Sequence, residues 1–210
     1  MGNLIIFMPR LVQATGASPG QAIRQEMLQD YLLDSDAEKL SLVDLQLPLP
    51  CSSPTLFYPG CGADIIYLML FLEKAFPALQ KISLVLNDVE NNMGMIKTIL
   101  DDIGITFSEA GKDNIHFYWN SISVNLQFLV GNAFLMDLPA FDIYFERAFR
   151  IMKSEDLGYE SRIYKRLNGN GILISDSGFV NVTLEKFPVS SELSSYGEMI
   201  VGRKRYNSSI

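Results

Sequence analysis

The chain has 210 residues, of which 48% are hydrophobic and 20% are charged. This composition is typical of a folded globular protein and excludes extensive disorder. The formal net charge of −7 repels phosphate backbones and argues against general nucleic-acid binding. No apolar run approaches the ~20 residues that a membrane-spanning helix needs, so no membrane partner is expected.

The chain contains only two cysteines, Cys51 and Cys61. Because Cys61 lies inside a glycine-containing turn, a disulfide framework is not expected, and the reducing cytoplasm is the favoured location. Neither cysteine belongs to a cluster with metal-ligand spacing, and His116 is the only histidine. The sequence therefore predicts a cytoplasmic protein without a metal site.

Residues 1–52 are predicted to form a helical cap and a linker ahead of a domain over residues 53–210. Apolar residues recur at helical spacing within 20–33, which predicts one amphipathic helix or two. The segment "LQLPLPCSSP" (45–54) then carries three prolines and several small polar residues. Such a composition is typical of a connector between structural elements.

From residue 55 onward, apolar strand-like runs alternate with helical stretches. The predicted strands are 55–58, 82–87, 126–130, 141–145 and 171–175, and the predicted helices are 63–76, 90–104 and 160–169. Continuous apolar runs are typical of parallel strands that are buried on both faces. The alternation predicts an α/β fold with a doubly wound, mostly parallel sheet.

Two regions depart from this alternation. Residues 114–130 are predicted to form a hairpin that leads into the third strand, because two β-rich runs flank the turn-prone "NSIS". The tail is predicted to add strands near 182–187 and 198–205, with no convincing helix before them.

Chemistry-bearing residues follow three consecutive predicted strands. Gly60 and Gly62 form a turn at the mouth of a helix, where a ligand could approach the backbone N–H groups. Asp88 ends the second strand and could accept both hydroxyls of a ribose, while Asn132 follows the third strand and could meet an adenine edge. The alternatives are an ordinary tight turn, Asp88 as a helix N-cap and Asn132 as a turn former.

Between residues 53 and 205 the sequence resembles the class I S-adenosylmethionine-dependent methyltransferases. The segment "YPGCGAD" stands where that family has its acidic, glycine-rich loop, and "LVLNDVE" stands at its second motif. "VGNAF", "FDIYFERAF" and "LNGNGILISD" stand at its third motif and at its fourth and fifth strands. The resemblance implies a methyltransferase-like Rossmann fold and S-adenosylmethionine as the cofactor.

The resemblance also assigns roles to individual residues. It places Gly60, Cys61 and Gly62 beneath the methionyl and ribose part of the cofactor, and Asp88 at the ribose hydroxyls. It places Val89 and the pair Asn132–Ala133 at the border of the adenine. Glu146 and Arg147, at the end of the fourth strand, would face the methionine end or the substrate and are the candidate catalytic residues.

Two positions depart from the family pattern. Tyr58 stands where the family usually has an acid that helps to hold the amino group of the cofactor, and Asp64 replaces the third glycine. Either Asp64 restores the missing carboxylate, or the site is weakened. Tyr58 and Asp64 are both predicted to be cofactor-binding residues.

Methyl transfer from a sulfonium is an in-line displacement that needs alignment in a dry pocket, but neither a metal nor a covalent nucleophile. The candidate acid–base residues are Glu146, Asp176 and Tyr144. For Tyr144, core packing is the preferred interpretation; Asp176 could cap a turn, and His116 is assigned to a hairpin face. Because "FERAF" lacks the Asn/Asp-Pro-Pro-aromatic signature of exocyclic amino methylation, a small-molecule acceptor is preferred over DNA adenine.

Two other functions stay open at this stage. One is a non-catalytic binding or assembly module that keeps the methyltransferase fold, which the tyrosine at position 58 favours. The other is an NAD(P)-dependent oxidoreductase, which also uses a glycine turn and an acid after the second strand. The oxidoreductase is disfavoured because a pyrophosphate at this helix start would meet the negative charge of Asp64.

Overall fold

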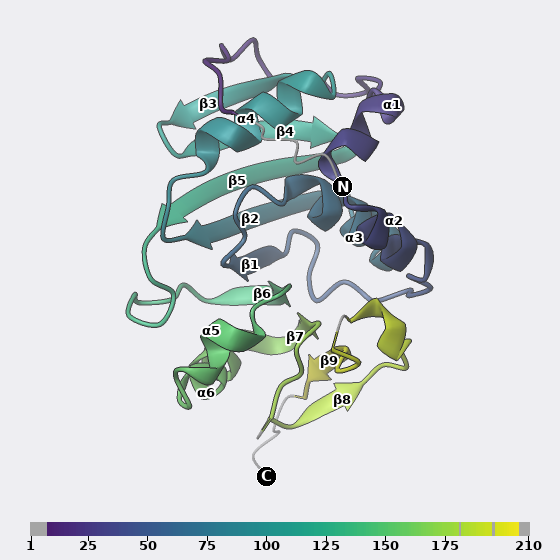
Figure 1. The fold of residues 1–210 in the computed structure, drawn as a ribbon, viewed down its shortest axis with the longest axis vertical. Coiled ribbons are helices and arrows are strands. Elements are labelled where there is room, and N and C mark those ends of the chain that lie inside the picture. Colours follow the sequence, from purple (N-terminus) through teal and green to yellow (C-terminus); the bar gives the residue numbers. More distant parts are fainter. Residues whose placement is uncertain (1–7, 181, 195, 206–210) are drawn as a thin grey trace, which may run out of the picture.

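A mixed β-sheet is the centre of the computed structural model, which describes residues 8–180, 182–194 and 196–205 (Figure 1). Its strands are β1 (Thr55–Pro59), β2 (Lys81–Asp88), β3 (Phe107–Gly111), β4 (Asn114–Trp119), β5 (Ile122–Val130), β6 (Phe141–Glu146), β7 (Leu167–Ser175), β8 (Leu184–Lys186) and β9 (Ile200–Lys204). Their order across the sheet is β3-β4-β5-β2-β1-β6-β7-β9-β8. The five strands from β5 to β7 run parallel, and β4 and β9 run antiparallel to their neighbours. The predicted doubly wound, mostly parallel sheet is confirmed.

Helices cover both faces of this sheet. On one face lie α3 (Ile65–Ala75) and α4 (Met93–Asp102), and their buried residues belong to one hydrophobic cluster. On the other face lie α5 (Arg150–Ser154) and α6 (Tyr159–Arg166), next to a second hydrophobic cluster. β1 supplies Leu56 to the first cluster and Phe57 to the second. Side chains that alternate along a strand therefore separate the two helical layers.

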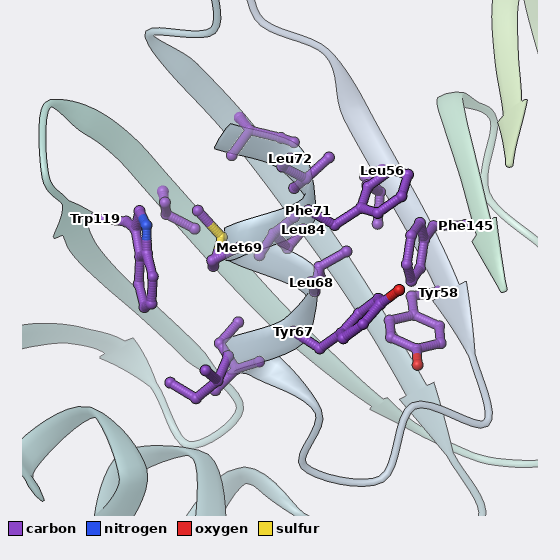
Figure 2. Packing of buried hydrophobic residues seen from close by; sticks show 14 of the residues in the cluster. Leu56, Tyr58, Tyr67, Leu68, Met69, Phe71, Leu72, Leu84, Trp119 and Phe145 are labelled. Atoms are coloured by element: carbon purple, nitrogen blue, oxygen red, sulfur yellow. The ribbon is translucent and has the colours of Figure 1, made fainter. Parts of the chain in front are cut away.

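The helix α3 is apolar on nearly all sides, and the structure gives the reason. Phe71 of α3 meets Phe145 of β6 at a ring distance of 5.3 Å, and Tyr58 of β1 meets the same ring at 5.0 Å (Figure 2). The other side of α3 is covered by the N-terminal segment, whose Leu47 N–H donates to the carbonyl oxygen of Ala75 across 2.8 Å. A helix between two apolar layers buries its whole circumference.

The N-terminal segment forms three short elements, of which two lie within the predicted helix 20–33 and the third follows it. They are α1 (Gln25–Leu28), the 3₁₀ turn η1 (Gln29–Tyr31) and α2 (Asp34–Ser41). Leu28 and Leu40 are buried in the same hydrophobic cluster as α3 and the central strands. The division of the chain at residue 52 stays a prediction.

Other boundaries follow the predictions with a few differences. The hairpin of β4 and β5 and the tail strands β8 and β9 are present, with the 3₁₀ turn η2 (Ser191–Leu193) between the tail strands. β3 and α5 were not predicted. β7 begins at Leu167, inside the predicted helix 160–169, and the segment "NGNG" (168–171) lies within the strand as an irregularity with Asn170 at φ 64°. A bulge of this kind holds a turn-like sequence within a strand.

Candidate functional site

The carboxyl ends of β1 and β6 mark the point where the winding of the sheet changes direction. From β1 the chain proceeds through β2 to β5 on one side, and then crosses back to β6 and β7 on the other. In doubly wound sheets, ligands bind in the crevice at such a point. The glycine turn follows the end of β1, and Arg147 follows the end of β6.

The glycine turn has the backbone conformation that its residues predict. Gly60 and Gly62 have φ values of 60° and 54°, in the left-handed region that glycine adopts without a steric penalty. Between them, Cys61 is buried, and its N–H donates to the carbonyl oxygen of Asn87 across 3.2 Å. Burial raises the pKa of the Cys61 thiol, which keeps it neutral.

Asp88, at the end of β2, forms a hydrogen bond to the glycine turn. Its Oδ2 accepts a hydrogen bond from the Gly62 N–H across 2.8 Å, and its Oδ1 accepts one from the Glu90 N–H across 3.3 Å. The alternative of an N-cap is wrong, because α4 begins at Met93 and Asn91 Oδ1 accepts the Met93 N–H across 3.0 Å. The sequence therefore placed a carboxylate correctly at the turn, with a backbone partner that it did not predict.

The residues after β5 include a turn former. Asn132 Oδ1 accepts a hydrogen bond from the Phe134 N–H across 2.8 Å, which confirms the turn interpretation of that side chain. Ala133 is buried, whereas Val89 after β2 is 67% exposed. Of the three residues assigned to the adenine border, Ala133 is thus the one buried among apolar groups.

Phe149 covers one half of the glycine turn. A Cβ atom built on Gly60 would lie 2.7 Å from a ring carbon of Phe149, whereas one built on Gly62 would meet nothing within 4 Å. The Phe149 ring stacks on Phe134 at 5.7 Å and is itself buried. The turn is therefore open at Gly62 and closed at Gly60 by a side chain of the same protein.

Sequence reasoning missed Phe149 because the segment around it is short and locally irregular. Ala148 has φ 52°, which is uncommon for a residue other than glycine, and it ends the extended path of β6 abruptly. Both carboxylate oxygens of Asp176 accept the Ala148 N–H, at 3.0 and 2.9 Å. Asp176 thus holds the segment that carries Phe149, and burial raises its pKa.

Tyr58 and Asp64 belong to one polar cluster at the end of β1. The Tyr58 hydroxyl donates to Asp64 Oδ2 across 3.0 Å, and Arg147 Nη1 donates to the same oxygen across 2.8 Å. Burial raises the pKa of Asp64, an effect that the guanidinium opposes. A carboxylate is therefore present where the resemblance lacked one, and it is ion-paired with Arg147.

The N-terminal segment completes this cluster, which the sequence did not indicate. Arg147 Nη2 donates to the carboxylate of Asp36 in α2, which lies 111 positions away in the chain, and Cζ lies 3.8 Å above the ring of Tyr67. Burial raises the pKa of Tyr67 to about 12. No local pattern marked Asp36, because its partner is brought to it only by the packing of α2 on α3.

Glu146 does not face the crevice, contrary to the expectation from the sequence. Its side chain is fully buried on the side of the sheet that α5 covers. Oε1 accepts bonds from Lys153 Nζ at 2.6 Å and from the hydroxyls of Ser175 and Ser177, and Oε2 accepts one from the Tyr144 hydroxyl at 2.6 Å. These four bonds tie the carboxylate to α5, to Tyr144 of β6 and to the end of β7, which is a structural role.

Two further candidates have structural partners. The preferred packing interpretation of Tyr144 is confirmed, because its ring is buried and its hydroxyl donates to Glu146. His116 lies on β4, and its Nε2 is 3.1 Å from the Ser123 hydroxyl across the hairpin, as expected for a hairpin face. Cys51 and Cys61 are both free.

The described residues contain neither a metal-binding cluster nor a membrane-spanning helix. Within them, no three histidine, cysteine, aspartate or glutamate side chains form a group that could hold a metal ion. None of their helices combines the length and the apolar character that crossing a bilayer requires.

The geometry fits a nucleoside ligand on one side of the turn. At Gly62 the space that a Cβ would take is open, and the half-buried carboxylate of Asp88 lies beside it. At Gly60 the Phe149 ring would have to move before a ligand could touch the backbone. A ligand could therefore approach the backbone at Gly62 as it stands, and at Gly60 only after the Phe149 ring moves.

No protein-family model and no curated protein matches the chain. Among solved structures, it is similar to a proposed S-adenosyl-L-methionine-dependent methyltransferase from Methanococcus maripaludis, with 12% identity over 88% of this chain and 90% of that one (TM-score 0.47). It is also similar to a SAM-dependent methyltransferase from Thiobacillus denitrificans in complex with S-adenosyl-L-homocysteine, with 11% identity over 71% of this chain and 52% of that one (TM-score 0.39).

A third similar structure is phosphoethanolamine N-methyltransferase 2 from Haemonchus contortus, with 16% identity over 66% of this chain and 27% of that one (TM-score 0.41). The chain thus spans about half the length of the second protein and about a quarter of the third. At these identities the likeness concerns the fold alone.

Proposed function

We propose that the chain is an S-adenosylmethionine-dependent methyltransferase that acts on a small molecule. The observation that carries the proposal is the carboxylate of Asp88 beside the open Gly62, at the switch point of a doubly wound sheet. A carboxylate at the end of the second strand is suited to bind both hydroxyls of a ribose. The order of the motifs along the sequence supports the choice of this cofactor over other nucleosides.

Each part of the cofactor has a candidate partner in the chain. Asp88 would bind the ribose hydroxyls, and Gly62 and Cys61 would contribute the backbone beneath the ribose. Ala133 would border the adenine, with Val89 and Asn132 at its exposed edge. Arg147, which is ion-paired with Asp36 and Asp64 at the end of β6, would face the methionine end of the cofactor or the substrate.

The cofactor supplies an electrophilic methyl group when it is bound. The chain would contribute by orienting the two reactants and excluding water, which are the main requirements of an in-line displacement. We do not assign Glu146 a direct role, because its two carboxylate oxygens already accept bonds from Lys153, Ser175, Ser177 and Tyr144. Arg147 stays the candidate that faces the substrate.

One observation favours the second candidate, a non-catalytic module with the same fold. The Phe149 ring covers Gly60, so the ligand-free protein closes half of the turn by itself. The oxidoreductase is disfavoured on the same grounds as before, since Asp64 lies directly before α3 and its carboxylate is largely buried there. A pyrophosphate at that helix start would meet this charge.

Calorimetric titration of the full chain with S-adenosylmethionine, S-adenosylhomocysteine, NAD and NADP tests the proposal. We expect the two sulfur nucleosides to bind and the two dinucleotides not to bind. A ligand present at 100 times its Kd should also stabilise the native state by about 2.7 kcal/mol. Binding of NAD or NADP alone would favour the oxidoreductase, and binding of none of the four would favour the non-catalytic module.

A further inference from the structure

A cavity of about 860 Å³ lies next to α5, separate from the glycine turn. Arg150, Lys153 and Ser154 of α5 line it, whereas Phe149 and Met152 approach Gly60. The remaining walls come from α6, from the residues that follow β7 and from the start of β9. Its volume is within the range of small-molecule sites in proteins.

One wall of the cavity is apolar. It is formed by Leu157, Phe179, Val180, Met199 and Ile200. Leu157 is 99% exposed and Val180 is 66% exposed, so apolar surface continues from the cavity to its mouth. Adjacent apolar surface of this kind marks a binding site more often than scattered single side chains do.

The charged groups of the cavity leave an excess of carboxylate. Its lining contains three acidic residues (Asp156, Glu160 and Glu198) and two basic ones (Arg150 and Lys153). Two charged residues outside the lining join them, because Arg162 pairs with Asp156 and the buried Glu146 shares Lys153 with Glu160, so one carboxylate stays in excess. Lys153 is already engaged, because its Nζ donates to Glu146 and to the carbonyl oxygen of Gly178 and lies 3.2 Å from Glu160 Oε1 in an ion pair.

The other basic residue, Arg150, forms a longer and more exposed ion pair than Lys153 does with Glu146. Arg150 lies 3.2 Å from Glu198, and their side chains are 48% and 42% exposed. An exposed ion pair of this kind contributes little to stability, so either partner can exchange for a ligand. Glu198 is therefore an accessible carboxylate at the edge of a cavity that already carries excess negative charge.

We propose that this cavity binds a small organic cation with an aromatic or aliphatic body. The ammonium group would lie at Glu198, and the apolar body would lie against Phe179 and Met199; Glu160 is less available, because its oxygens face Lys153 and the Val180 N–H. An organic anion of the same size would have Arg150 as its single exchangeable partner and would be repelled by the remaining carboxylates. The proposal does not depend on the proposed function, because it invokes no contact with the glycine turn.

Titration of the full chain with tryptamine and with indole-3-acetate tests the proposal, because the two probes share one aromatic body and differ in the sign of their charge. We expect tryptamine to bind at least tenfold more tightly. Leu157→Arg, which places a cation on a fully exposed residue at the mouth, should weaken tryptamine at least fivefold.

A matched pair of variants separates the cavity from the general charge of the protein. Glu198→Gln should weaken tryptamine at least threefold, whereas Glu185→Gln should leave it unchanged. Glu185 is also a half-exposed carboxylate beside an arginine, 3.9 Å from Arg205, but it lies outside the cavity. Equal binding of the two probes, tighter binding of indole-3-acetate, binding of neither, or equal effects of the two variants would overturn the proposal. Titration with S-adenosylhomocysteine reports on the glycine turn separately.

Discussion

The carboxylate of Asp88 accepts a hydrogen bond from the backbone N–H of Gly62 across 2.8 Å, which ties the end of β2 to the turn that follows β1. The two residues lie 26 positions apart in the chain and meet because β1 and β2 pair in parallel up to Pro59 and Asn87. The group proposed to bind a ribose therefore also holds the shape of the turn in the ligand-free protein.

Replacement of Asp88 should affect both stability and binding. Asp88→Ala leaves the Gly62 N–H without its acceptor, and a hydrogen bond to a charged group contributes about 1.5–3 kcal/mol to stability. We expect a loss in this range by urea denaturation and an affinity for S-adenosylhomocysteine at least tenfold lower by calorimetry. Asp88→Asn, which keeps an acceptor oxygen, should retain more of the stability. Unchanged affinity in Asp88→Ala would remove the residue from the binding site.

Alanine should be tolerated less at Gly60 than at Gly62. Both positions have a left-handed backbone, which costs a residue with a Cβ about 1–2 kcal/mol. At Gly60 the new Cβ would in addition lie 2.7 Å from the Phe149 ring. We expect Gly62→Ala to lose about 1–2 kcal/mol and Gly60→Ala to lose more. In the double variant Gly60→Ala/Phe149→Ala the losses should be less than additive; additive losses would show that the ring does not press on Gly60.

Shortening Phe149 should improve ligand binding while it lowers stability. If the ring must leave Gly60 before a cofactor binds, the measured Kd equals the intrinsic Kd divided by the fraction of open molecules. We expect Phe149→Leu to bind S-adenosylhomocysteine more tightly than the wild type, with a lower midpoint of thermal unfolding. Phe134→Leu is the control, because Phe134 stacks on Phe149 without approaching Gly60. A tighter complex in both variants would contradict a specific role of Phe149.

The buried pair of Glu146 and Lys153 should act on stability as a unit. Their side chains are 0% and 7% exposed, with Oε1 and Nζ 2.6 Å apart. Removal of one partner leaves a buried charge poorly compensated, which costs about 3–5 kcal/mol. We expect Glu146→Leu and Lys153→Met each to be strongly destabilising, and the double variant to lose less than the two single losses combined. Independent losses in denaturant titrations would argue against the coupling.

The contact between the N-terminal segment and α4 should depend on pH. Hydrogen bonding from Arg10 lowers the pKa of Asp102 from its ordinary value of 3.8, and the Tyr31 hydroxyl adds a second bond. Because the pKa is lowered on folding, this carboxylate stabilises the protein above pH 3.8, and the stabilisation is lost as the pH falls through the folded-state pKa.

Asp102→Asn should therefore be less stable than the wild type at pH 6, and the difference should shrink below pH 3.8. Thermal unfolding of both proteins between pH 6 and pH 2.5 measures it. Asp101→Asn is the control, since Asp101 also lies near Arg10 but on a more exposed side chain. A constant difference across the whole range would show that the charge of Asp102 is not the cause.

The sequence by itself determined the alternation of strands and helices, the left-handed glycine turn and the carboxylate after β2. These features depend on residues within a few positions of one another, such as the apolar run of β2 and Asp88 at the end of that strand. It did not determine the cover over Gly60, the burial of Glu146 or the pairing of Arg147 with Asp36. Each of these depends on elements that are distant in the chain and meet only after α5 packs on one face of the sheet and α2 packs on α3 on the other. The sequence around a charged residue at a strand end does not show whether that residue faces a crevice or is covered by a helix. In this protein α5 covers Glu146, which only the tertiary structure shows.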